Sequence, residues 1–170
     1  DLMFASYSIN YLIACEFYSG NYLKSIHDSI INLKPLMLNS IKQYSSNFYF
    51  LFLEKYIYGL MKGEAITISN QDKKELMELE ENQNIKPLFD IALAIQSYIL
   101  TDYQSALEFS SEANERVDYV QSMFHVPYIN AFFSLALISY YKTKEQLKQK
   151  KVFSTIKKNQ KKLKLWADNS

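Results

Sequence analysis

Apolar residues recur at every third or fourth position along most of the chain, a period typical of α-helices with one buried side. The pattern is interrupted where glycine, proline or a small polar residue can begin or end a helix. We therefore predict an all-α protein of about eight helices. The expected helices span residues 2–19, 21–33, 45–62, 70–82, 87–100, a stretch capped at 102, 127–141 and 143–167.

The helix ends are predicted from residues with strong local preferences. The first helix should stop at Gly20, and Asn21 is the expected N-cap of the second. Pro35 should break or kink that second helix, because its ring clashes with the preceding turn. Asp102 and Thr143 are the expected N-caps of the sixth and eighth helices. The remaining breaks, which end the third helix and open the fifth and seventh, fall at Gly63, Pro87 and Pro127.

The composition narrows the fold class further. The chain of 170 residues contains three glycines and three prolines, where average usage would give about twelve and eight. Sheet-rich folds need frequent turn residues, and phosphate-binding loops need clustered glycines. Rossmann, Walker-type and β-sandwich folds are therefore excluded, and the length suits a single domain over residues 1–170.

Two segments of the chain are similar when the sequence is compared with itself at a shift of 81 positions. Residues 20–26 read Gly-Asn-Tyr-Leu-Lys-Ser-Ile, and residues 101–107 read Thr-Asp-Tyr-Gln-Ser-Ala-Leu. The same shift pairs Leu12 with Leu93 and Phe17 with Tyr98. The chain therefore looks like two copies of a four-helix unit, about 1–82 and 83–170. Each copy would consist of two helical hairpins, which bury together faces that neither could bury alone.

Four side chains in these segments have expected packing roles. Tyr22 and Tyr103 should fill the groove between the two helices of their hairpins. Ser25 and Ala106 should be small so that the helix backbones can approach closely. These residues would then carry the contacts on which the repeated unit depends.

The turn segments resemble the tetratricopeptide repeat (TPR), whose hairpin turn reads Gly, polar, Tyr, two free positions, Ala and an aliphatic residue. Residues 20–26 differ from that pattern only at Ser25, and residues 101–107 have Thr101 in place of the glycine. Both copies have serine where the second helix usually carries an aromatic residue, and their hairpins of about forty residues exceed the standard length of about 34. The resemblance implies a right-handed TPR-like superhelix of about four antiparallel hairpins.

The same comparison implies a candidate binding groove on the inner face of the array. Its apolar stripe needs a cover, either from adjoining repeats or from a partner segment, and the sequence leaves both open. The groove positions are Asn10, Ala14 and Tyr18 in the first copy and Ile91, Ile95 and Ile99 in the second.

The last predicted helix carries a more specific resemblance. Residues 158–167, Lys-Asn-Gln-Lys-Lys-Leu-Lys-Leu-Trp-Ala, are similar to a signature of very large bacterial signalling proteins. Those proteins join a serine/threonine-kinase-like domain, an AAA-type ATPase, a long TPR-like region and often a GAF domain and a histidine kinase. The resemblance implies an internal, non-catalytic fragment of such a kinase. The signature residues are Asn159, Gln160, Lys161, Lys162 and Trp166.

Charge is distributed unevenly along the chain. Residues 1–141 carry a formal charge of −7, and residues 142–170 carry +8. A basic tail is compatible with nucleic-acid binding. This tail has no arginine, the commonest reader of bases, so a solvated face or an acidic protein neighbour is the favoured interpretation.

Compartment and partners follow from what remains of the composition. The longest strongly apolar run, residues 131–141, is shorter than the roughly 20 residues of a membrane span. Cys15 is the only cysteine, which favours a reducing compartment and hence the cytoplasm. The expected partners are proteins or peptides, including neighbouring domains of the same chain.

No residue pattern indicates catalysis, a cofactor or a metal site. His27 and His125 lack metal-ligand spacing, and His125 is expected in a capping or surface role. Cys15 lies among apolar residues and is expected to be an inert core thiol. A cluster of acids is expected to face solvent rather than hold a cation; it comprises Glu75, Glu78, Glu80 and Glu81.

The abundant aromatic residues favour packing between helices. Two pairs, Tyr140 with Tyr141 and Phe48 with Phe50, could instead line a peptide-binding groove. The hypothesis is therefore a helical-repeat scaffold that relays signals within a larger kinase. The alternatives are a free-standing adaptor that grips a peptide or helix, an enzyme, and a module that docks onto nucleic acid or acidic protein through its last helix.

Overall fold

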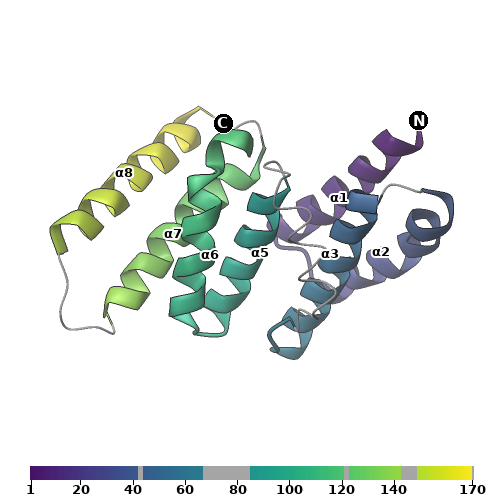
Figure 1. The fold of residues 1–170 in the computed structure, drawn as a ribbon, viewed down its shortest axis with the longest axis horizontal. Helices are drawn as coiled ribbons and strands as arrows, with labels where there is room; N and C mark the ends of the chain where they lie inside the picture. Colours follow the sequence, from purple (N-terminus) through teal and green to yellow (C-terminus); the bar gives the residue numbers. More distant parts are fainter. Residues whose placement is uncertain (42–43, 67–84, 121–122, 143–148, 170) are drawn as a thin grey trace. The chain divides into compact units, whose positions relative to one another are not determined.

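The computed structural model describes residues 1–41, 44–66, 85–120, 123–142 and 149–169. These residues form helices and turns without a strand, so the predicted all-α class is confirmed for the described part of the chain (Figure 1). Seven α-helices lie within it. They are α1 (Leu2–Tyr18), α2 (Leu23–Pro35), α3 (Tyr44–Lys62), α5 (Lys86–Ile99), α6 (Tyr103–Glu115), α7 (His125–Lys142) and α8 (Gln149–Asp168).

About eight helices were expected, and the one predicted at 70–82 lies outside the described residues, as does the predicted cap Thr143. Two short helical turns complete the described structure. The π-helical turn η1 covers Leu36–Ser40, and the 3₁₀ turn η2 covers Val117–Val120. Among the described residues, no helix is long and apolar enough to cross a membrane.

The chain folds as two compact units, Asp1–Thr67 with α1 to α3 and Ile68–Ser170 with α5 to α8. Within each unit, consecutive helices contact each other. In each unit the first helix also contacts the third, since α1 contacts α3 and α5 contacts α7. This arrangement lets the first helix of each unit bury its apolar side against two neighbours, as in stacked helical hairpins.

The turn after α1 closes the helix with a Schellman motif. The Asn21 N–H donates to the Glu16 carbonyl at 3.1 Å, and the Gly20 N–H donates to the Phe17 carbonyl at 3.0 Å. Gly20 has a φ of +78°, the left-handed conformation that glycine adopts without steric cost. The predicted helix stop at Gly20 is therefore confirmed.

The turn after α5 repeats this pattern at the positions that the sequence comparison pairs with it. The Asp102 N–H donates to the Ser97 carbonyl at 2.9 Å, and the Thr101 N–H donates to the Tyr98 carbonyl at 3.1 Å. Thr101 has a φ of +64°, although it carries the Cβ that disfavours this conformation. The two paired turns thus have the same hydrogen bonds.

When residues of the two units are paired by the sequence comparison, the helices that follow the two turns begin at positions that are not paired. The preceding helices end at paired residues, Tyr18 in α1 and Ile99 in α5. In contrast, α6 begins at Tyr103, the partner of Tyr22, whereas α2 begins one position later, at Leu23. The first turn therefore contains one additional residue. Because one residue rotates a helix by about 100°, this addition changes which side chains face the partner helix.

The extra residue overturns two of the predicted packing roles. Tyr22 lies outside α2, and 88% of its surface is exposed, so the prediction that it fills the groove is wrong. Ser25 is exposed, and Ile26 is the buried residue at that level of α2. In the second unit Ala106 is fully buried as expected, and Tyr103 is half-buried, with its ring centroid 5.6 Å from that of Tyr98.

The N-cap predictions divide in the same way. Asp102 caps α6 as predicted, because its carboxylate accepts the Ser105 N–H at 3.1 Å. The prediction for Asn21 is wrong, since the additional residue makes Tyr22 the N-cap and leaves the first turn of α2 without a side-chain cap.

Pro35 ends the regular hydrogen bonding of α2 as predicted. It is the last residue of the helix, and η1 follows at once. Proline has no N–H for the α-helical ladder, and its ring crowds the preceding turn, so the backbone leaves the α-helical path.

Replacing Thr101 with glycine should raise the free energy of unfolding by about 0.5–1 kcal/mol, because glycine adopts a positive φ without strain. The matched change Gly20→Ala should lower it by about 1 kcal/mol. A Cβ at Gly20 meets no atom within 4 Å, so this cost comes from the backbone conformation. Urea unfolding followed by circular dichroism measures both changes, and shifts of the opposite sign would contradict the shared left-handed turn.

Candidate functional site

Four of the six predicted groove residues are buried, which argues against an open binding groove along them. Asn10 and Ala14 of α1 are buried, and the Asn10 amide donates to the Ser46 carbonyl at 3.0 Å and to the Ser46 Oγ at 2.8 Å. Ile91 and Ile95 of α5 are buried as well. These side chains pack within the folded chain, and a peptide could reach them only by displacing what covers them.

The other two predicted groove residues are more accessible. Tyr18 is half-buried, and Ile99 is exposed over 56% of its surface. Ile99 is the last residue of α5, so its exposure belongs to a helix end rather than to a continuous stripe. Burial of four of the six residues fits the alternative in which other parts of the chain cover the stripe, and a partner-binding groove stays a prediction.

Aromatic rings hold α1 and α3 together in the first unit. The ring of Phe17 meets that of Tyr56 edge-on, with centroids 5.2 Å apart, and Phe52 stacks beside Tyr56 at 6.1 Å. Burial raises the pKa of the Tyr56 hydroxyl well above its ordinary value. Phe48 and Phe50 are also buried, which supports packing rather than a binding groove for them.

A corresponding contact joins α5 and α7 in the second unit. The ring of Tyr98 meets that of Phe132 edge-on, with centroids 5.8 Å apart. The sequence comparison pairs Tyr98 with Phe17, so the same position of the first helix contacts the third helix in both units. Tyr140 and Tyr141, the second pair proposed for a groove, are half-buried at the end of α7.

Asn159, the first signature residue of the last helix, joins α8 to α7. Its side chain is buried, and its amide donates to the Ser134 Oγ at 3.1 Å. Ser134 in turn donates to the Asn130 carbonyl at 2.9 Å. The Asn130 amide donates to the Val126 carbonyl at 3.0 Å, so a chain of polar groups runs along α7 and ends on α8.

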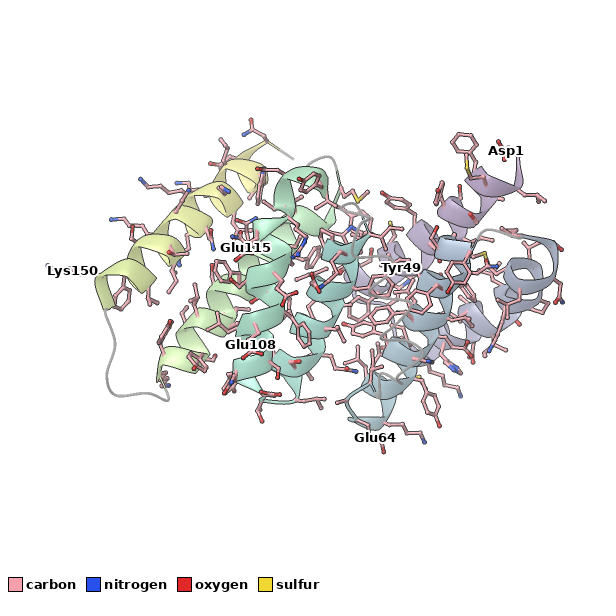
Figure 2. The ribbon with its side chains drawn as sticks, in the orientation of Figure 1. Asp1, Tyr49, Glu64, Glu108, Glu115 and Lys150 are labelled. Atoms are coloured by element: carbon pink, nitrogen blue, oxygen red, sulfur yellow. The ribbon has the colours of Figure 1, made fainter. Side chains whose placement is uncertain are left out.

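The rest of the signature lies at the edges and on the outside of α8. Gln160 and Lys161 are exposed, and Lys162 and Trp166 are half-buried. The outside of the helix carries a stripe of exposed lysines. With 3.6 residues per turn, the four lysines fall within an arc of about 60° around the helix axis. The stripe, which begins near the labelled Lys150 in Figure 2, consists of Lys150, Lys157, Lys161 and Lys164.

The structure corrects the predicted burial of two residues that carry reactive or titratable side chains. Cys15 is exposed rather than a core thiol, because Ile13 and Ala14 take the buried side of α1. His125 is buried rather than at the surface, and this burial lowers its pKa to about 4. His27 is half-buried, with its ring centroid 5.8 Å from that of Tyr58.

The acidic cluster lies at positions that the structure does not describe. Its four members, Glu75, Glu78, Glu80 and Glu81, fall within residues 67–84. Among the described residues, no three histidine, cysteine, aspartate or glutamate side chains gather closely enough to hold a metal ion.

A buried ion pair in α5 was not predicted from the sequence. The Lys86 ammonium donates to Asp90 in the same helix and to the Glu112 Oε2 of α6 at 3.0 Å. Burial raises the pKa of Asp90 to about 6, and the bond to Lys86 opposes this shift. Burial alone would lower the pKa of Lys86, but its bonds to Asp90 and Glu112 outweigh that effect and raise it.

The spacing of Lys86 and Asp90, one helical turn apart in an apolar helix, was the available sequence signal for this pair. The contribution of Glu112 depends on how α6 packs and has no local signal. The cluster links α5 and α6 through charge.

No protein-family model, curated protein or solved structure matches the chain. The described residues join helices through three kinds of contact: packing of aromatic rings, hydrogen bonds from side-chain amides, and ion pairs. Such joints set the relative positions of the helices that they connect.

Replacing Asn159 with alanine should lower the free energy of unfolding by about 1–2 kcal/mol, because a buried hydrogen bond between α8 and α7 is lost. The matched variant Gln160→Ala changes an exposed neighbour and should shift it by less than about 0.5 kcal/mol. Hydrogen exchange should also become faster in α8 of the first variant. Equal stability and equal exchange in the two variants would contradict the role of Asn159.

Asp90 and His125 should give opposite pH dependences of stability. Asp90 has a pKa of about 6 in the folded chain against 3.8 for the ordinary group. Its contribution to the free energy of unfolding is therefore present below about pH 4 and is lost as the pH rises to about 6. His125 has a pKa of about 4 against 6.5, so its contribution is present above about pH 6.5 and is lost as the pH falls to about 4.

Two variants separate these effects. Stability of Asp90→Asn should rise between pH 4 and 6, because His125 remains, and stability of His125→Gln should fall over the same range. Each change should reach about 3 kcal/mol at most, from shifts of about two pKa units. Urea unfolding at a series of pH values measures both slopes, and slopes of the same sign in the two variants would refute the assignment.

Proposed function

We propose that the chain is a non-catalytic, TPR-like helical-repeat scaffold that mediates contacts between proteins or between domains. The observation that carries this proposal is the repeated architecture. The paired ends of α1 and α5 have the same hydrogen-bonded turn, and in each unit the first helix packs against both the second and the third. Such arrays act by presenting surfaces rather than by chemistry.

The second part of the proposal is a signal relay within a larger signalling kinase, which rests on the resemblance of residues 158–167. Asn159 supports this idea, because the signature residue forms the polar joint of α8 on α7. A ligand or neighbouring domain that prefers one position of α8 would shift the population of that position. The shift would then bias the activity of the domains on either side.

Binding of a peptide in the predicted groove is the less favoured function. It would need Asn10, Ala14, Ile91 and Ile95 to be accessible, and all four are buried. The scaffold proposal has no such requirement, since it uses the joints between helices.

The test of the relay uses the natural protein in which these 170 residues occur. In that protein, Asn159→Ala should change the rate of ATP-dependent autophosphorylation by about fivefold or more, the size expected for coupling between domains. Gln160→Ala is the matched control and should leave the rate unchanged. Equal rates in both variants, or a natural protein that lacks autophosphorylation, would overturn the relay.

A further inference from the structure

One side of α1 exposes six apolar or weakly polar side chains, with the exposed Ser8 among them. Its residues lie within about 180° of each other around the helix, as expected from 3.6 residues per turn, and side chains of α1 project from the ribbon near Asp1 in Figure 2. All six are exposed. We call this surface the α1 outer face, and it comprises Met3, Phe4, Tyr7, Tyr11, Leu12 and Cys15.

Two members of the α1 outer face, Tyr11 and Cys15, influence each other. Tyr11 and Cys15 are one helical turn apart, and the pKa of the Tyr11 hydroxyl is raised by partial burial and by the nearby Cys15.

The absence of charge distinguishes this face from an ordinary solvated helix side. Between Asp1 and Glu16 the sequence of α1 has no charged residue. Surface helices usually carry charged or polar residues on the side away from the core, and a helix that is apolar all round is usually buried. The outer side of α8, which carries four exposed lysines, has the usual character.

The positions of α5 that correspond to Tyr11, Leu12 and Cys15 are buried, whereas Leu88, the counterpart of Tyr7, is half-buried. Leu12 is exposed over 50% of its surface, whereas Leu93, its counterpart in α5, is exposed over 7%. Cys15 is exposed, and its counterpart Gln96 is buried. The same register of the first helix is thus covered in one unit and open in the other.

We propose that the α1 outer face binds the same face of a second copy of the chain. An uncharged surface can meet its own copy without the like-charge repulsion that identical charged faces would suffer. Its aromatic residues belong to the types enriched in the buried centres of interfaces. A two-fold symmetric pair is also the commonest form of self-association.

The area of the α1 outer face sets the expected affinity of the dimer. From the exposed fractions, and about 150–250 Å² for each large side chain, the face offers roughly 500 Å² of surface. Two copies would bury about 1,000 Å² together, the lower limit for a specific interface. The dimer should therefore be weak and depend on protein concentration.

Analytical ultracentrifugation of the full 170-residue chain, over a range from low to several hundred micromolar, tests the proposal. The wild type should shift from monomer towards dimer as the concentration rises. Phe4→Lys should remain a monomer, because a charge would be buried in the interface without a partner. The matched control is Phe153→Lys on α8, since Phe4 and Phe153 are both exposed over 64% of their surface. This control should dimerise like the wild type.

Cys15 provides a second readout, because it is the only cysteine and lies on the proposed interface. Its reaction with a maleimide should slow as the wild-type concentration rises and should stay constant in Phe4→Lys. A wild type that is monomeric at every concentration overturns the proposal, as does a dimer that Phe4→Lys leaves intact. A monomer with a protected Cys15 also overturns it, since another part of the same chain would then cover the face.

Discussion

The burial of apolar side chains between a helix and the helix two positions later is the interaction on which each unit depends. Phe17 meets Tyr56 across α1 and α3, and Tyr98 meets Phe132 across α5 and α7. Tyr56 is buried and the other three rings are half-buried, so each of these three contributes only part of the roughly 1.5–3 kcal/mol of full burial. A single hairpin lacks the third helix that completes this burial, so three consecutive helices are the smallest arrangement that closes the core.

Buried polar groups fix the alignment of helices that also pack through apolar side chains. Asn10 joins α1 to α3 through Ser46, and Asn159 joins α8 to α7 through Ser134. Apolar contacts tolerate sliding, whereas a buried amide loses a hydrogen bond when helices shift. These joints therefore specify how the helices align, and the scaffold proposal depends on that alignment being sensitive to what binds.

Local features could be predicted from the sequence, and features that depend on register or packing could not. Gly20 and Asp102 act where predicted, because a left-handed turn and an N-cap are decided within a few residues. Tyr22 was misplaced because one additional residue in the first turn is invisible in a comparison at a constant shift. The exposure of Cys15 and the burial of His125 depend on which neighbours pack against α1 and α7. The burial of Asn10, Ala14, Ile91 and Ile95 depends on packing in the same way.

The central claim is that the first helix of each unit packs on the third, and nuclear Overhauser effects between aromatic rings test it most directly. In a sample with selectively labelled phenylalanine and tyrosine, cross-peaks should join Phe17 to Tyr56 and Tyr98 to Phe132, whose centroids are 5.2 Å and 5.8 Å apart. Both cross-peaks together would support the shared architecture of the two units. A spectrum in which both rings of the first helices contact only the second helices would contradict it.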